Sequence, residues 1–406
     1  MSKEKRRVPK LRFPGFTEDW EQRKADYIFK SVTDKGYPEL PVLSASQELG
    51  MVYRDQNGID IQHDKKNETS YKRVLPGQFV IHLRSFQGGF AYSEIEGITS
   101  PAYTVMSFKN SSEQYGLFWK HVFKSEIFIK RLETITYGIR DGRSISFSDF
   151  KSLLLQYPSF SEQKLIGDSI AVIERGITLH QRKLDNLKLK KKALLQKLFP
   201  KNGERYPELR FPGFTDAWEQ RKLSDISTKV TTKNVDVHYT ETLTNSAEQG
   251  IISQVDFFDK EISNKDNING YYIVENHDFI YNPRISTLAP VGPINRNKLN
   301  RTGIMSPLYT VFRASKVDLG FLEWYFQSNH WHRYMKLNGD SGARADRIAI
   351  KDSTFFDMPI KTPVNIKEQV LIGETLEKFN QYITLHQRKL DHLQLQKKAL
   401  LQQMFV

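Results

Sequence analysis

One long segment of this chain occurs twice, and that repetition limits the possible fold more than any other feature. Residues 162–199 align without gaps to residues 368–405, 206 positions later, with about 23 identities in 38 columns. Apolar residues recur in both copies at alternating steps of four and three, which is the spacing of a coiled-coil seam. The sequence therefore predicts two long helices whose seams can pair with each other.

The expected seam combines apolar residues with a few polar ones. The residues that we assign to it are Ile177, His180, Leu184, Leu187 and Leu194 in the first copy and Ile383, His386, Leu390, Leu393 and Leu400 in the second. Two roles are open for the histidines: a buried polar pair that fixes the register of the helices, or side chains at the seam's edge that reach water. Lys191 and Lys397 also fall in the seam, and we expect their ammonium groups to extend outward past an apolar stem.

A second repeat precedes each helix. The block LRFPGFTEDWEQRK at residues 11–24 returns at residues 209–222 with about 12 of 14 positions matching. The chain is therefore a tandem duplication of a short aromatic block, a variable globular region and a long helix. Because the block is nearly identical in both copies, we expect it to pack inside the protein rather than to recognise a ligand. The expected parts are a first domain at 1–157, its helix at 158–200, a second domain at 201–362 and its helix at 363–406.

The two globular regions, residues 25–157 and 223–362, share only sparse landmarks. Both contain a Ser-Pro-x-Tyr-Thr-Val run and a Gly-x-Arg-x-x-Arg pattern, while the residues between these landmarks differ almost freely. Short β-branched and aromatic runs predict strands, and the stretches 115–133 and 319–336 have helical apolar spacing. We expect an α+β class with one fold in both regions and a different surface on each.

Charge and composition narrow the function. The net charge is +13, so a polyanion is the expected partner, and nucleic acid is favoured over a membrane surface. The chain has no cysteine, no apolar stretch of membrane-spanning length and no apolar run after its basic start. We therefore expect a cytoplasmic protein without a membrane partner.

Arginines and lysines of the globular regions are the candidates for contact with DNA. Arginine can grip guanine or a phosphate with two parallel hydrogen bonds, and the glycine-rich pattern that recurs in both regions would let the backbone approach closely. The candidates are Lys65, Lys66, Lys72, Arg73, Arg84, Arg140 and Arg143 in the first region and Arg284, Arg296, Arg301, Arg344 and Arg347 in the second.

No catalytic constellation can be assembled from the sequence. There is no phosphate-binding loop of the Gly-x-x-x-x-Gly-Lys type, no histidine spacing suited to a metal, and no cysteine ligand. The run Asn282-Pro283-Arg284-Ile285 begins like the catalytic motif of adenine methyltransferases but lacks its second proline and its aromatic residue. We expect neither a catalytic residue nor a bound metal.

The alternation of two divergent regions with two near-identical helices resembles the specificity subunit of type I restriction–modification systems. The resemblance rests on the Leu-Arg-Phe-Pro-Gly-Phe block with its tryptophan, the Ser-Pro-x-Tyr-Thr-Val run and the Glu-Gln…Ile-Thr-Leu-His-Gln-Arg-Lys-Leu-Asp helix, each present twice in this order. It implies two target recognition domains that each read half of a split, asymmetric site in double-stranded DNA. It also implies that the helices form an antiparallel coiled-coil spacer with pseudo-two-fold symmetry.

The resemblance implies partners as well. Two copies of a methyltransferase subunit would dock on the repeated regions, and restriction subunits with a translocase would join through them. S-adenosylmethionine, ATP and Mg would then be bound by those partners only, and this chain would carry no cofactor. A phage protein that mimics DNA is a further partner that a basic groove would admit.

Physical arguments are compatible with this interpretation but leave others open. A seam of about 22 residues is roughly 33 Å long, close to one turn of B-DNA at roughly 34–36 Å. The competing interpretations are a scaffold whose basic charge only aids solubility and a DNA-binding regulator with the same duplicated fold. Indifference to duplex DNA would favour the scaffold, and tight binding without a methyltransferase would favour the regulator.

Overall fold

The computed structural model of the chain describes residues 7–46, 49–54, 65–82, 89–133, 145–201, 203–258, 265–341 and 346–406. The chain forms two compact units. Unit 1 comprises Met1–Gln181 and Arg388–Val406, and unit 2 comprises Arg182–Gln387. Each unit thus takes its helical part from both copies of the repeated segment.

Unit 1 contains the first globular region. Its central antiparallel sheet has the order β2-β9-β6-β7, and three two-stranded pairs, β1-β10, β3-β4 and β5-β8, surround it. The strands are β1 (Glu21–Lys24), β2 (Phe29–Val32), β3 (Leu43–Ser46), β4 (Gly50–Tyr53), β5 (Lys72–Val74), β6 (Phe79–Ile81), β7 (Phe90–Tyr92), β8 (Gly97–Thr99), β9 (Thr104–Phe108) and β10 (Leu154–Tyr157). The short helices are α1 (Ala25–Ile28), the 3-10 helix η2 (Lys65–Ser70), α2 (Gly116–Val122), α3 (Glu126–Glu133) and α4 (Phe147–Ser152).

Unit 2 repeats this plan. Its central sheet has the order β12-β19-β16-β17, beside the pairs β11-β22, β13-β14, β15-β18 and β20-β21. The strands are β11 (Glu219–Lys222), β12 (Ser227–Lys229), β13 (Leu243–Ser246), β14 (Gly250–Ser253), β15 (Tyr272–Val274), β16 (Phe279–Tyr281), β17 (Ile294–Arg296), β18 (Gly303–Met305), β19 (Thr310–Ala314), β20 (Asp340–Ser341), β21 (Ile348–Ala349) and β22 (Pro359–Thr362). The short helices are α6 (Leu223–Ile226), α7 (Gln254–Phe258), the 3-10 helix η3 (Lys265–Gly270), α8 (Leu319–Gln327), α9 (His332–Asn338) and α10 (Asp352–Phe356).

The duplicated α+β fold is therefore confirmed, although few residues are shared between the two regions. One detail differs from the sequence prediction. Each of the two stretches with helical apolar spacing forms two short helices instead of one, α2 and α3 in the first region and α8 and α9 in the second. The Ser125 and Ser328 hydroxyls lie at these breaks and donate to the carbonyl oxygens of Val122 and Tyr325, at 2.7 and 2.5 Å. Such hydroxyls offer the backbone an alternative to continued helix.

The long helices are α5 (Phe160–Lys197) and α11 (Ile366–Gln403), each with 38 residues. In unit 1, Glu174 of α5 forms an ion pair with Lys397 of α11 at 2.8 Å. In unit 2, Lys191 of α5 donates to Asn380 of α11 at 2.9 Å. An early residue of one helix meets a late residue of the other in both units, so the helices pair antiparallel, as expected.

The residues assigned to the seam are where the helices bury their surface. All ten are buried or half-buried, including both histidines, while most of their neighbours in the sequence are exposed. Lys191 differs from the expectation that its ammonium extends outward. It is half-buried, it lies 4.5 Å from the ring centre of Trp324, and burial lowers its pKa. Lys397 likewise turns toward Glu174 rather than to water.

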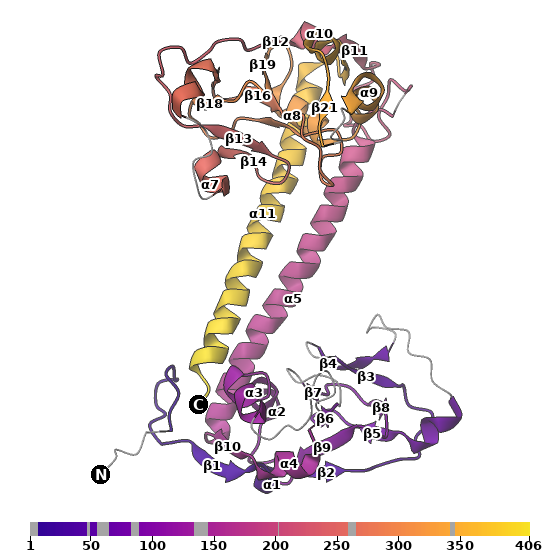
Figure 1. Ribbon diagram of the computed structural model, residues 1–406. Helices are drawn as coiled ribbons and strands as arrows, with labels where there is room; N and C mark the ends of the chain where they lie inside the picture. The colour runs from indigo at the N-terminus through magenta and orange to yellow at the C-terminus, as the bar shows by residue number, and fades with distance from the viewer. Residues whose placement is uncertain are drawn as a thin grey trace. The chain divides into compact units, whose positions relative to one another are not determined.

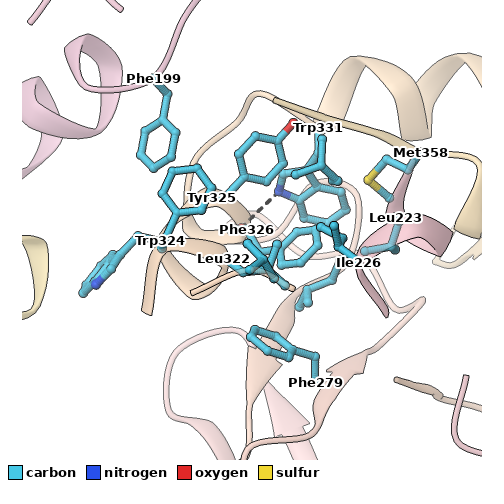
Figure 2. Close-up of a cluster of buried hydrophobic side chains, with 14 of the residues drawn as sticks. Phe199, Leu223, Ile226, Phe279, Leu322, Trp324, Tyr325, Phe326, Trp331 and Met358 are labelled. Atoms are coloured by element: carbon cyan, nitrogen blue, oxygen red, sulfur yellow. Dashed lines mark hydrogen bonds between the residues drawn. The ribbon is translucent and has the colours of Figure 1, made fainter. Parts of the chain in front are cut away.

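Each long helix ends inside the globular core of the other repeat. The ring of Phe405, just beyond α11, lies 5.7 Å from that of Phe118 in unit 1, and the yellow end of α11 lies next to α2 and α3 in Figure 1. In unit 2, Phe199 follows α5 and lies 5.5 Å from Phe321. Figure 2 shows Phe199 facing Tyr325 in this cluster. The globular cores are therefore completed by distant parts of the chain.

The aromatic block holds these helices in place. The backbone N–H of Leu11 donates to Gln403 at 2.9 Å, and that of Leu209 donates to Lys197 at 2.8 Å, so each block caps the carboxyl end of a helix. Arg12 forms two hydrogen bonds with the buried Glu162, and Arg210 does the same with Glu368. The block tryptophans Trp20 and Trp218 are buried. The block therefore packs against the fold through its tryptophans and arginines, as a structural role predicts, while Leu11 and Leu209 stay exposed.

Glu174 gives unit 1 a pH-dependent stability. Burial alone would raise its pKa, but the neighbouring His121 and the positive charges of Lys120 and Lys397 lower it from the ordinary 4.5 to about 2. A carboxyl with a depressed pKa stabilises the fold above its unfolded-state pKa and loses that contribution as the pH falls toward its folded-state pKa. We expect the contribution of Glu174 to be lost between about pH 4.5 and pH 2, and Glu174→Gln to flatten the dependence of unit 1 within that window. Thermal melting across that range, with the exposed Glu39→Gln as control, measures the difference.

Among the helices of the described residues, none has the length and apolar character that crossing a membrane requires.

Candidate nucleic-acid interface

Two of the predicted arginines lie opposite each other in unit 2. Arg284 follows β16 and Arg347 precedes β21, and their backbones form an isolated antiparallel bridge. Hydrogen bonds at 2.9 Å flank the bridge on both sides, from Ile285 to Asp346 and from Ile348 to Pro283. Both arginines are exposed. The fold thus joins the strand-end arginine and the second arginine of the Gly-x-Arg-x-x-Arg pattern into one site.

Among the described residues, no carboxylate neutralises this pair of like charges. Within the described ranges, neither the Arg284 nor the Arg347 guanidinium has a hydrogen-bond or ion-pair partner. Like charges directly opposite each other on paired strands are unfavourable. A bound anion would relieve that repulsion, and a phosphate or a guanine edge suits two guanidinium forks. The exposed arginine pair is therefore the candidate anion site of unit 2.

A network of amide side chains supports the arginine pair. Asn282 accepts from the backbone N–H of Arg284 at 3.0 Å and donates to the carbonyl oxygen of Asn245 at 2.9 Å. Asn245 is buried, and its side chain accepts from Asn295 at 2.7 Å, which accepts in turn from Gln327 at 2.8 Å. Satisfied buried networks make the backbone beneath a site rigid, which favours a defined binding geometry.

This network was not found by sequence reasoning. Asn282 was noticed only as part of a rejected methyltransferase motif, and its role is to fix the loop that carries Arg284. The amides come from separate strands and from α8, and no spacing rule connects them. The one available signal was the position of Asn282 directly after a buried strand.

Two other predicted arginines, Arg73 and Arg296, are already paired with carboxylates of their own unit. Arg73 lies 2.5 Å from Glu96 and also near Asp34. Arg296 lies 2.6 Å from Glu323 and is mostly buried. Their contact with DNA stays a prediction, and it would require these ion pairs to be exchanged for new ones.

Arg301 and the lysines complete the described candidates. Arg301 forms two hydrogen bonds of 2.7 Å with Glu241. Lys72 donates to the carbonyl oxygen of Tyr103 at 2.6 Å, and burial lowers its pKa. Lys66 is exposed on η2. The side chain of Lys65 and the residues Arg84, Arg140, Arg143 and Arg344 lie outside the described residues.

The same arginine pair is encoded in the first region. Arg84 follows β6 as Arg284 follows β16, and Arg143 holds the place of Arg347 in the repeated Gly-x-Arg-x-x-Arg pattern. Both residues lie outside the described residues, so only the sequence relates them to the pair in unit 2. In the part of the chain that the structure describes, no cluster of histidine and carboxylate side chains suits a metal ion.

The comparison with known proteins rests on structure. No protein-family model matches the chain, and no curated protein is similar to it. The crystal structure of the S subunit of a type I restriction–modification system from M. genitalium superposes with a TM-score of 0.60 at 12% identity, over 98% of this chain and 99% of that chain. The chain has the fold of a type I S subunit. The resemblance found in the sequence is thereby confirmed at the level of the fold.

Two further solved structures are similar over nearly their whole length, each with a TM-score of 0.45. The HsdS subunit from Thermoanaerobacter tengcongensis is 14% identical, with 97% of both chains covered. A chain from a study of complex assembly and conformational transition of the type I R-M system is 16% identical, over 98% of this chain and 99% of that chain.

Proposed function

We propose that this chain is the DNA sequence-specificity subunit of a type I restriction–modification complex and is itself non-catalytic. The observation that carries the proposal is the exposed Arg284–Arg347 pair, whose guanidinium groups have no partner among the described residues and whose backbone rests on an amide network within an S-subunit fold. Arginine forks on a preorganised backbone are suited to phosphates and guanine edges. No cofactor is needed for this role, and S-adenosylmethionine, ATP and Mg would be bound by the partner subunits.

Each globular region would read one half of a split DNA site. Both have the same sheet order, and the sequence of the first region carries Arg84 and Arg143 at the positions that correspond to Arg284 and Arg347. Their other surface residues differ, and the two half-sites should therefore differ in sequence. Because both reading regions belong to one chain, the second contact with DNA becomes intramolecular and raises the overall affinity.

The long helices offer equivalent surfaces for two copies of one partner. On α5 the exposed apolar residues Leu165, Val172 and Leu179 recur every seven positions, which places them along one side of the helix. On α11 the exposed Leu371 and Leu385 occupy the places of the first and the last of these. Exposed apolar rows on a helix are typical of protein interfaces. We assign these rows to the methyltransferase subunits, through which the restriction subunits would join.

Changing this row should weaken assembly without unfolding the chain. Leu179→Asp together with Leu385→Asp places charges where the partner would bury leucines, and we expect co-purification with the methyltransferase subunit to fall at least tenfold. The control is Leu189→Asp with Leu395→Asp, because these leucines are also exposed and equivalent but lie roughly 80° around each helix from the row. Equal loss of assembly in both double variants would contradict the assignment.

The proposed function is tested by methylation. The chain is co-expressed with the methyltransferase subunit of a type I system from the same genome, and the methylated adenines of the host DNA are mapped. We expect one split motif with a fixed gap, in which exchanging residues 223–362 for those of another S subunit changes one half only. A stable complex that adds no methylation would overturn the proposal and favour a scaffold. Tight sequence-specific DNA binding without any methyltransferase would favour a regulator.

A further inference from the structure

A cluster of ion pairs joins the first globular region to the long helices. Lys120 of α2 is 13% exposed, and its ammonium lies 3.1 Å from Glu94 and 3.3 Å from Glu174 of α5. Glu174 also pairs with Lys397 of α11 at 2.8 Å. The globular region thus presents a cation to a carboxylate of the helices.

The second globular region has an equivalent cluster of ion pairs in which the signs of the charges are reversed. Glu323 of α8 is 14% exposed and lies 2.6 Å from Arg296 and 3.1 Å from Lys298. Lys298 extends to Glu377 of α11 at 3.3 Å. The central group is therefore an anion, and the contact to the helix carboxylate is made by a flanking cation.

The central residues of the two clusters occupy equivalent positions. Phe118 and Phe321 each pack against the tryptophan of the aromatic block, with ring centres 5.7 Å apart in both units. Lys120 and Glu323 each stand two residues after these phenylalanines. The charge at this position is therefore reversed between the regions.

The flanking residues are reversed too. In the central sheets, Phe79 of β6 stands opposite Tyr92, and Phe279 of β16 stands opposite Arg296. Glu94 and Lys298 each follow two residues after these partners, so an anion in the first region corresponds to a cation in the second. The carboxylate that each region contacts also stands at a different place on its helix. On α5 it is Glu174, whereas on α11 it is Glu377, which corresponds to a position three residues before Glu174 in the repeat.

We propose that this reversed polarity assigns each globular region to its own place on the helices, so that the two regions are not interchangeable along the chain. Exchange would put Glu323 against Glu174 and Glu94 against Glu377. In each of these contacts a native ion pair would be replaced by two carboxylates that repel each other, and Glu323 and Glu174 are both half-buried. Such repulsion is a common way for a protein to exclude a wrong partner. The inference does not depend on DNA binding.

The test compares two full-length chimeras in which residues 25–157 and 223–362 change places. One keeps the native helices. The other also carries Ala171→Glu, Glu174→Asn, Glu377→Ala and Asn380→Glu. These substitutions exchange the residues at equivalent positions of α5 and α11, so that each globular region again meets the helix carboxylate that it contacts in the native chain. We expect the unmatched chimera to melt at least about 3 °C lower than the matched one, since about 1 kcal/mol shifts the midpoint by roughly 2–4 °C at this size. Equal melting of both chimeras would overturn the proposal.

Point variants give an answer even where chimera junctions disturb folding. Lys120→Glu gathers three carboxylates around one position, and Lys120→Met removes the charge while keeping the size of the side chain. We expect Lys120→Glu to melt lower than Lys120→Met, and the addition of Glu94→Lys to restore most of the loss. Identical melting of Lys120→Glu and Lys120→Met, or no recovery with Glu94→Lys, contradicts the assignment by charge.

Discussion

Replacing Phe405 by alanine is expected to lower the free energy of unfolding of unit 1 by about 3–5 kcal/mol, the usual cost of a buried phenylalanine. Phe405 stands almost at the end of the sequence, where a substitution would ordinarily have little effect. Its side chain is nevertheless 5% exposed and lies 5.7 Å from the ring of Phe118 in the core of the first globular region. The variant should therefore damage the region that begins the chain.

Hydrogen exchange followed by mass spectrometry locates this damage. In Phe405→Ala, the strands β6 and β9 should lose protection while β16 and β19 keep theirs. Phe199→Ala should give the reverse pattern, because Phe199 completes the core of unit 2. Leu395→Ala, on an exposed surface of α11, is the control and should change neither unit. A loss of protection confined to the carboxyl-terminal residues would show that Phe405 is not part of the core.

The duplication, the long helices and the α+β class could be predicted because they leave regular patterns in the sequence. The repeat of Ile-Thr-Leu-His-Gln-Arg-Lys-Leu-Asp is local, and so is the seam spacing. No such pattern indicates that the end of each long helix packs in the globular core of the other repeat. Phe199 and Phe405 follow identical Lys-Lys-Ala-Leu-Leu-Gln segments, and only tertiary structure shows which core receives each ring.

The candidate site was predicted less well, for a related reason. A basic residue in a sequence gives no sign of the carboxylate that will neutralise it when that partner is distant. Arg301 pairs with Glu241, and Arg73 pairs with Glu96, from other strands or loops. Arg347 was chosen for the recurring Gly-x-Arg-x-x-Arg pattern and Arg284 for its place after a strand-like run, and neither signal indicates whether a carboxylate lies nearby. The fold, rather than the residue type, separates an arginine with an internal partner from one without a partner among the described residues.

Removing the arginine pair should abolish specific DNA binding while leaving the fold intact. A well-placed arginine contributes about 1–3 kcal/mol to recognition, so Arg284→Ala and Arg347→Ala should each weaken binding of the methylation-defined site by about tenfold or more. The double variant should lose specific binding, measured by competition with unrelated duplex at fixed salt. Its melting temperature should stay the same or rise slightly, because two opposed like charges are removed.

Arg301→Ala is the matched control for this prediction. It removes the same charge from the same unit, but its guanidinium is held by Glu241 with two hydrogen bonds of 2.7 Å. Since surface charge acts on DNA at a distance, Arg301→Ala should reduce binding of specific and unrelated duplex alike, and only slightly. The arginine pair should instead change the ratio between the two. If Arg301→Ala and Arg347→Ala weaken both kinds of binding equally, then net charge alone carries the affinity and the pair reads no sequence.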